Sequence, residues 1–487
     1  MKKISVFTFI ILSSLILFGQ KKSKTEPLIE PLIIKGRLIN CPEKTLKIFF
    51  EDRNGSLLTD TINLNGNGNF YLKTFKIKLP QRTSIGQNNI QINNIFVAPG
   101  YNLTITGDAK DFPTLFKTTK IQGIGAESNQ YRAMLNDAMV HEANAKKWYD
   151  MDEKELLVYA RKTRKTADFI AHLVFDKKTV HDKYLGYFKK MVRVDNESMN
   201  LYYLLAHVDM NKYNYEKSVA IVRDNFDNNF LKNIFNDEYF ISKDYKTWVM
   251  SEYLTYIVKL DYLKDSTLKK LNNYRLEKAS KTYTGKAKEY VLYKLITSPI
   301  DQTRSFESLN NYKEQFKPYI SILSNPFHKR SVYEKIAAKE TELLKTGIGK
   351  PAPAFTLKNN LAKTYSLADF KGKVVYLDLC ASWCGPCRAE TPHFKILYNK
   401  YKDDNRIAFI SVAINDGINE WKKALEQDKP DWIQLLDTEG TVGKAYVASL
   451  IPQFIIIDKQ GIIVNLDAPA PSSGNGIENM LLKEMEK

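Results

Sequence analysis

Cysteine is scarce in this chain, with four residues in 487. A scaffold held together by many disulfides is therefore excluded, because such proteins carry far more cysteine for their length. Three of the four cysteines nevertheless lie within eight residues, in Cys380-Ala-Ser-Trp-Cys-Gly-Pro-Cys387. This crowding predicts a chemical role for the stretch. The fourth, Cys41, has no cysteine neighbour, and we expect it to be a half-buried packing residue.

Glycine almost disappears over the middle of the chain. Between Tyr131 and Lys345 the only glycines are Gly186 and Gly285. Apolar residues recur there at helical spacing, as in Tyr245, Trp248, Val249, Tyr253, Ile257 and Leu260. We therefore predict an all-α region over residues 127–345 with about eight helices. Three prolines are expected to mark helix starts or ends: Pro299, Pro318 and Pro326.

Long apolar runs are absent too, apart from one. Residues 4–18 are almost wholly apolar and follow Met1-Lys2-Lys3, which is the layout of a secretory signal peptide over residues 1–20. We expect an exported, periplasmic protein. The alternative is an uncleaved segment that tethers the protein to the inner membrane. No cysteine follows the run, which argues against a lipid-modified N-terminus.

Negative charge is outnumbered, since 72 Lys and Arg stand against 55 Asp and Glu, for a net charge of +17. The basic residues are scattered among acidic ones and form no dense block. A lysine-rich solvated surface accounts for this pattern, and we expect no nucleic-acid partner.

Residues 21–126 alternate short β-type runs with turn signals. The runs cover residues 32–40, 45–53, 56–64 and 70–79, and Asn54-Gly55 between the second and third is typical of a hairpin turn. Further β-type sequence lies on either side of Pro99-Gly100. Strands at intervals of about ten residues predict an antiparallel β-sandwich or small barrel.

The last part of the chain, residues 346–487, alternates strands and helices. A Gly/Pro-rich segment at 347–353 is predicted to be a linker. Strands are predicted at 373–380 and 406–414, helices at 386–401 and 418–427, and a hairpin at 453–464 before a terminal helix. A parallel βαβ unit followed by an antiparallel hairpin indicates an α/β domain.

The spacing of the three clustered cysteines has two interpretations. C-x3-C-x2-C is the spacing with which radical-SAM enzymes hold an iron–sulfur cluster. The last two cysteines alone form a redox pair in Trp383-Cys-Gly-Pro-Cys387, where Cys384 stands at a helix N-terminus that stabilises a thiolate. Cys380 ends a predicted strand, and the hundred residues that follow Cys387 are too few for the usual barrel around such a cluster. These two features favour the redox pair, with Cys380 as a packing residue.

Residues 346–487 resemble the TlpA/ResA family of thiol–disulfide oxidoreductases, which have a thioredoxin fold. The resemblance is carried by residues 349–357, 367–392 and 450–464, and it covers under a third of the chain. More weakly, residues 30–130 and the helical region resemble the N-terminal part often fused to such domains in bacterial envelope proteins. The whole chain is thus expected to be multidomain, with an antiparallel β domain, an all-α region and a C-terminal α/β thioredoxin fold.

The resemblance implies roles for individual residues. It makes Cys384 the attacking cysteine and Cys387 the resolving one. Ile451-Pro452 matches the cis-proline loop that faces the disulfide and binds substrate backbone. Asp378 occupies the place of thioredoxin's buried acid, where a raised pKa would let it accept a proton.

Four further residues complete the expected site. Glu390 matches the glutamate of the family's C-x-x-C-x-x-E-x-P pattern, which is implied to tune thiol pKa values; a helix-dipole role is the alternative. Trp383, Gly385 and Pro386 surround the sulfurs and are expected to contact substrate. No metal and no cofactor are expected.

These features predict an exported enzyme that reduces or isomerises disulfides in cell-envelope proteins through Cys384 and Cys387. Its expected partners are those substrates and a membrane electron donor of the CcdA/DsbD kind. The alternative is an envelope binding or scaffold protein whose β and α regions capture a partner. A peroxidase fits less well, because Cys384 lacks the Pro-x-x-x-Thr-x-x-Cys setting of that chemistry.

Overall fold

The computed structural model describes residues 30–52, 57–140, 146–176, 182–271, 273–448 and 450–487. The predicted signal peptide and the Asn54-Gly55 turn lie outside these residues. In the part of the chain that the structure describes, no helix is long and apolar enough to cross a membrane. The chain divides into two compact units. One holds the N-terminal β-sheets and residues 166–190, and the other holds residues 145–165 and 191–487.

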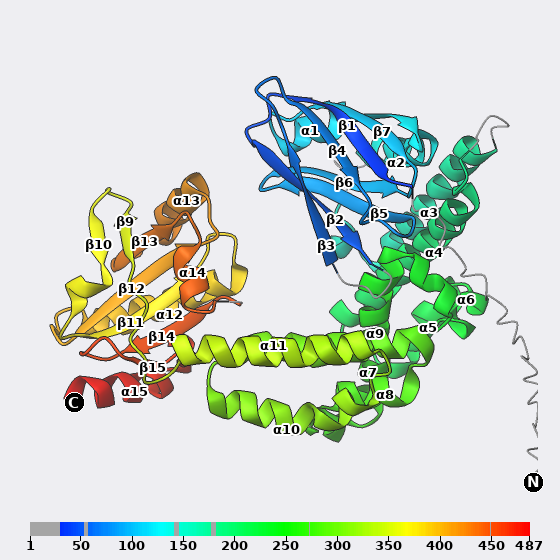
Figure 1. The fold of residues 1–487 in the computed structure, drawn as a ribbon. Coiled ribbons are helices and arrows are strands. Elements are labelled where there is room, and N and C mark those ends of the chain that lie inside the picture. Colours follow the sequence, from blue (N-terminus) through cyan, green and yellow to red (C-terminus); the bar gives the residue numbers. More distant parts are fainter. Residues whose placement is uncertain (1–29, 53–56, 141–145, 177–181, 272, 449) are drawn as a thin grey trace, which may run out of the picture. The chain divides into compact units, whose positions relative to one another are not determined.

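The first unit is built on two four-stranded sheets (Figure 1). Its strands are β1 (Leu32–Ile39), β2 (Thr45–Glu51), β3 (Leu57–Asn63), β4 (Asn69–Thr74), β5 (Gln81–Gln87), β6 (Ile90–Val97), β7 (Asn102–Asp108) and β8 (Lys120–Ile124), with helices α1 (Phe112–Thr118) and α2 (Ala126–Val140). One sheet has the order β4-β1-β7-β8 and the other β3-β2-β5-β6. Buried and exposed residues alternate along β1, β2 and β4, so each sheet buries one face, as in a sandwich.

One strand pair corrects the prediction of a wholly antiparallel β domain. Strand β1 runs parallel to β7, with Ile33 opposite Asn102 and Ile39 opposite Asp108. The predicted β2–β3 hairpin is confirmed by its antiparallel register. Parallel neighbours need a long connection, here through β2 to β6, and the period of two along a strand does not encode which distant strand lies beside it.

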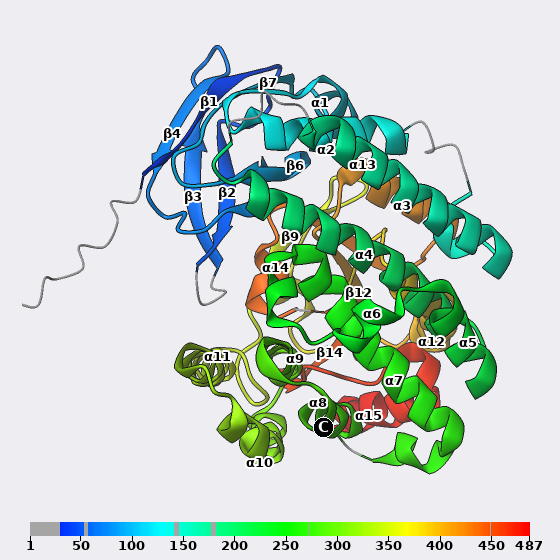
Figure 2. The same ribbon diagram turned by 90° about the vertical axis from the view of Figure 1, so that its right-hand side faces the viewer.

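The helical region contains α3 (Glu153–Phe175), α4 (Leu185–Met210), α5 (Tyr215–Asn225), α6 (Asn228–Lys232), α7 (Met250–Lys264), α8 (Tyr274–Thr282), α9 (Gly285–Thr297), α10 (Phe306–Ile322) and α11 (Pro326–Lys345). The described residues thus hold more helices than the predicted eight, because some, such as α6, are single turns. Helices α9, α10 and α11 lie side by side in both views (Figures 1 and 2).

Two of the three prolines stand where the sequence predicts them. Pro326 begins α11, and Pro299 lies in the first turn of a short 3-10 helix, Ser298–Gln302. Pro318 instead lies inside α10. Buried Phe316 and Ile320 on either side of it pack into the helical core, and this burial offsets the backbone hydrogen bond that the proline removes.

The C-terminal elements form a seven-stranded sheet with the order β10-β9-β13-β12-β11-β14-β15. Its strands are β9 (Thr356–Asn359), β10 (Thr364–Ser366), β11 (Val374–Cys380), β12 (Ile407–Ile414), β13 (Ile433–Asp437), β14 (Gln453–Ile457) and β15 (Ile463–Asn465). The helices are α12 (Gly385–Tyr401), α13 (Ile418–Asp428), α14 (Thr441–Ala445) and α15 (Asn475–Glu486). The predicted βαβ unit and hairpin are confirmed: β11 lies between parallel β12 and antiparallel β14. This is the thioredoxin-like fold.

Strand β11 buries both of its faces, and the faces differ. Val375, Leu377 and Leu379 join one apolar cluster. Val374 and Tyr376 join another, which includes Phe394 of α12. Because side chains alternate along a strand, Asp378 and Cys380 follow Tyr376 onto the α12 face. The sheet therefore puts a carboxyl and a thiol beneath the helix that carries the other two cysteines.

Candidate active site

Cys384 and Cys387 form a disulfide at the start of α12, with their Cα atoms 5.3 Å apart. Cys384 is the N-cap residue, and its sulfur accepts a hydrogen bond from the Cys387 backbone N–H at 3.2 Å. Exposed Gly385 and Pro386 form the turn between them, with proline in the first helical turn, where its missing N–H costs nothing. Helix N–H groups and the helix dipole at this position stabilise a thiolate on Cys384 once the disulfide opens.

The loop opposite the disulfide contains a cis peptide bond between Ile451 and Pro452. This confirms the cis-proline that the sequence resemblance implies. The Ile451 carbonyl oxygen lies 3.7 Å from Cys384 Sγ, and Ile451 packs against the cluster of Ala381, Cys384 and Cys387. Strand β14 begins at the next residue, Gln453, and holds this loop against β11. The disulfide and the loop therefore lie at the same end of the neighbouring strands β11 and β14.

Trp383 is an open side chain next to these sulfurs. It is 64% exposed, although its indole N–H donates to the Asn415 carbonyl at 3.0 Å. The preceding Ser382 is fixed by the same loop, because its N–H and hydroxyl both donate to Asp416. The Trp383 ring is fixed by this one hydrogen bond and is otherwise largely exposed, so it can contact an apolar partner.

Asp378 is buried, as the sequence predicts, with 8% of its surface exposed. The Ser411 hydroxyl donates to its Oδ2 at 2.7 Å, and its Oδ1 has no hydrogen-bond partner within ordinary geometry among the described residues. Burial raises the pKa of Asp378 to about 7, although the Ser411 hydroxyl and the neighbouring Cys380 thiol oppose this rise. A carboxyl with this pKa exchanges protons near neutral pH.

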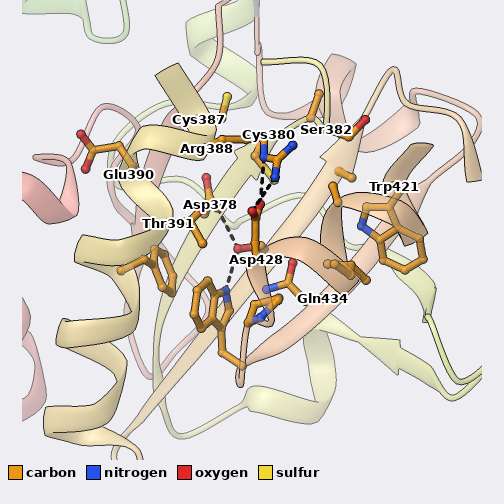
Figure 3. Close-up of a pocket in the computed structure, with 18 of the residues that line it drawn as sticks. Asp378, Cys380, Ser382, Cys387, Arg388, Glu390, Thr391, Trp421, Asp428 and Gln434 are labelled. Carbon is orange, nitrogen blue, oxygen red and sulfur yellow. Dashed lines mark hydrogen bonds and ion pairs between the residues drawn. The ribbon is translucent and has the colours of Figure 1, made fainter. Parts of the chain in front are cut away.

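A cavity of about 50 Å³ connects this carboxyl with the resolving cysteine (Figure 3). Both Asp378 and Cys387 line it, together with Cys380, Trp421, Trp432 and Gln434. Arg388 and Asp428 form an ion pair at its wall. The volume is enough for at least one water molecule, and the unpaired Asp378 Oδ1 offers a polar partner.

Glu390 also lines the cavity, but its side chain points away from Asp378 (Figure 3). Its carboxylate accepts hydrogen bonds from the Ser472 N–H at 2.9 Å and the Ser472 hydroxyl at 2.8 Å. The Glu390 charge nevertheless contributes to the raised pKa of Asp378. The described contacts thus give Glu390 a role in fixing the Ser472 turn.

Cys380 is a free, partly buried thiol in the same cavity. Burial raises its pKa well above the ordinary value, and Asp378 and Asp416 add to this effect. The protonated thiol is a poor nucleophile, which supports a packing role. Cys41 is likewise free and partly buried, and burial raises the pKa of its thiol.

Two residues of the site were not found from the sequence. Ser411 lies directly opposite Asp378 in the β11–β12 register. Trp432 donates its indole N–H to the Ser411 hydroxyl at 2.8 Å. A signal for Ser411 was present, because it is the single polar residue in the buried strand Ile407–Ile414. Trp432 carried no such signal.

Comparisons with known proteins agree with this site. The Redoxin family matches residues 348–481. The thiol–disulfide oxidoreductase ResA of Bacillus cereus is 31% identical over 134 residues, which are 28% of this chain and 75% of that protein. ResA of Bacillus subtilis is 29% identical over 121 residues, which are 24% of this chain and 65% of that protein.

Solved structures are also similar to the C-terminal domain. A putative thiol-disulfide oxidoreductase from Bacteroides vulgatus has 36% identity and a TM-score of 0.27, with 28% of this chain and 96% of that chain covered. A putative thiol:disulfide interchange protein DsbE from Chlorobium tepidum has 27% identity and a TM-score of 0.27, with 29% and 99% covered.

The fold, the Cys-Gly-Pro-Cys disulfide and the cis-proline loop define a thioredoxin-like thiol–disulfide oxidoreductase. Through this C-terminal domain the chain belongs to the TlpA/ResA-like family.

Proposed function

We propose that the protein is exported to the periplasm and reduces or isomerises disulfides of cell-envelope proteins by cycling Cys384 and Cys387 between dithiol and disulfide. The observation that carries this proposal is the disulfide at the N-terminus of α12, which faces the Ile451-Pro452 loop and has the buried Asp378 behind it.

In the first half of the proposed cycle, the Cys384 thiolate attacks one sulfur of a substrate disulfide. A mixed disulfide forms, and the other substrate sulfur leaves as a thiolate. The α12 N-terminus favours the thiolate form of Cys384 by supplying unpaired N–H groups. The exposed ring of Trp383 and the Ile451-Pro452 backbone provide contacts for the substrate chain.

In the second half, Asp378 accepts the Cys387 thiol proton through the shared cavity. The Cys387 thiolate then attacks Cys384 Sγ, the mixed disulfide breaks and the second substrate thiolate leaves. The substrate gains two electrons and leaves as two thiolates, which take up protons from Asp378 and from solvent. The protein is left with its Cys384–Cys387 disulfide. A pKa of about 7 suits Asp378 to this transfer at neutral pH.

Repeated reduction needs a source of electrons. A membrane dithiol donor of the CcdA/DsbD kind would reopen the Cys384–Cys387 disulfide by the same exchange in reverse. The apolar segment at residues 4–18 supports export, with cleavage after about residue 20 or retention as a tether to the inner membrane.

Insulin reduction by the purified chain, with Cys384→Ser alongside, tests this function. We expect activity in the wild type and a loss of at least about a hundredfold in the variant, because Cys384 is the N-cap of α12 and neither free cysteine, Cys41 or Cys380, stands at a helix N-terminus. Undiminished activity in Cys384→Ser would contradict the cycle.

A Cys387→Ser variant separates the enzyme from the scaffold alternative. Without the resolving thiol, mixed disulfides between Cys384 and substrate proteins accumulate and are visible on non-reducing gels. If cell-envelope extracts yield no such adducts while the N-terminal regions still retain a partner, the scaffold function replaces the proposed one.

A further inference from the structure

Asp378 is held by a chain of two hydrogen bonds that runs across the sheet. Trp432, which lies just before β13, donates its indole N–H to the Ser411 hydroxyl oxygen at 2.8 Å. Ser411, on β12, donates its hydroxyl hydrogen to Asp378 Oδ2 at 2.7 Å on β11. The three residues are at most 8% exposed. Water therefore has little access with which to replace either bond.

The direction of the two hydrogen bonds follows from the chemistry of the groups that form them. An indole N–H can only donate, so it occupies a lone pair of the Ser411 oxygen. The single hydroxyl hydrogen of Ser411 is then free to point toward Asp378. Oδ2 is thus kept as an acceptor. When Asp378 takes up a proton, that proton goes to Oδ1, which has no hydrogen-bond partner within ordinary geometry among the described residues. The carboxyl lines the cavity that it shares with Cys387.

We propose that Ser411 and Trp432 are positioning residues, which direct the Asp378 proton to Oδ1 and set the pH range of the resolving step. The inference rests on the proposed dithiol cycle. It assigns function to two residues that touch neither substrate nor sulfur and act only through Asp378.

The other groups that face Asp378 supply less of this control than Ser411 does. On α12, Arg388 is paired with Asp428 of α13, and Glu390 accepts from Ser472. On β11 itself, the Tyr376 hydroxyl donates to the Pro469 carbonyl. The neutral Cys380 thiol lowers the pKa of Asp378 by less than the Ser411 hydroxyl does. Beyond the strand, Asp416 accepts from Ser382. Ser411 is the strongest described donor to the carboxyl.

The test is the pH dependence of a single turnover. The reduced full-length chain is mixed with oxidised glutathione that carries two mutually quenched fluorophores. Loss of quenching, the first phase, reports attack by Cys384, because this step separates the two fluorophores. The fall in fluorescence anisotropy as the second label leaves the protein, the second phase, reports resolution by Cys387. In Ser411→Ala, loss of a hydrogen bond to a charged group moves the midpoint of the second phase upward by about one pH unit. Resolution then slows about fivefold at pH 7 and little at pH 9. The first phase keeps its profile.

Matched variants exclude a general packing effect. Ser411→Thr keeps the hydroxyl, and the midpoint of its second phase should equal that of the wild type. Trp432→Phe keeps the ring that stacks on Phe394 at 4.5 Å but removes the N–H, and it moves the midpoint upward by less than Ser411→Ala. Trp421→Phe is the control, because this buried tryptophan lines the same cavity outside the hydrogen-bond chain. Its midpoint stays at the wild-type value.

The outcomes separate this inference from the proposed function. If the wild-type chain shows no first phase that depends on Cys384, the proposed dithiol cycle itself is wrong. A normal wild-type profile with the same midpoint in folded Ser411→Ala overturns only the positioning role. Should Ser411→Ala not fold, Trp432→Phe carries the test, and an unmoved midpoint in that variant overturns the positioning role equally.

Discussion

Replacing Asp378 with asparagine should stabilise the protein at alkaline pH while it slows the enzyme. Burial raises the pKa of Asp378 from an ordinary value of 3.8 to about 7. Below pH 4 the carboxyl is protonated in folded and unfolded chains alike. Between pH 4 and 7 the unfolded chain ionises and the folded one does not, so stability falls as the pH rises through this range.

The size of the effect follows from the difference of about three pH units between the two pKa values. Each unit corresponds to about 1.4 kcal/mol, so the ionised carboxyl costs the folded state about 4 kcal/mol above pH 7. The asparagine amide has no charge to bury and fits the same space. Asp378→Asn should therefore gain up to about 4 kcal/mol over the wild type at pH 8, and little at pH 4.

Hydrogen exchange of the oxidised full-length chain in increasing urea measures this gain locally. Peptides from β11 and β12 report the unfolding free energy of the sheet around Asp378. Asp437→Asn is the control, because this aspartate is also buried but its carboxylate accepts hydrogen bonds from the Thr441 hydroxyl and from three backbone N–H groups of α14. We expect that variant to be destabilised. A gain for Asp378→Asn that is the same at pH 4 and pH 8 would refute the burial argument.

Two further predictions concern side chains beside the disulfide. Cys380→Ala should keep insulin reduction within about twofold of wild type, because burial raises the pKa of this thiol and leaves it a poor nucleophile; a loss above about tenfold in the same assay would show a redox role. Trp383→Ala should raise KM for insulin about fivefold, since an exposed aromatic contact contributes about 1 kcal/mol. The reduction potential of that variant, measured in thiol buffers, should stay at the wild-type value, and a shifted potential would place the ring among the groups that tune the sulfurs.

The sequence predicted the parts of the site that lie close together along the chain. The stretch from Cys380 to Cys387 contains both the turn and the start of α12. The geometry of the cysteine pair therefore follows from this short local sequence. The cis bond at Ile451 was accessible only through the family resemblance, because the local sequence does not specify which isomer a proline adopts.

The parts that depend on distant partners could not be predicted. Ser411 meets Asp378 because β11 and β12 pair in one particular register, and Trp432 reaches Ser411 from a segment with no predicted strand. The parallel β1–β7 pair was missed for the same reason. Periodicity shows which face of a strand is buried, but it does not show which strand lies beside it.

The same alternation along β11 explains why the acid lies close to the sulfurs. Tyr376 anchors the α12 face of the strand by stacking on Phe394, at 5.4 Å between ring centroids. Two residues further on, the same face must therefore meet the first turn of α12, where Cys387 lies. An apolar residue at position 378 would extend the core and stabilise the fold. The carboxyl instead raises the cost of folding at neutral pH, and in return its pKa lies where a thiol proton can be accepted. The burial that lowers stability at this position thus also gives Asp378 the pKa that the proposed resolving step requires of its base.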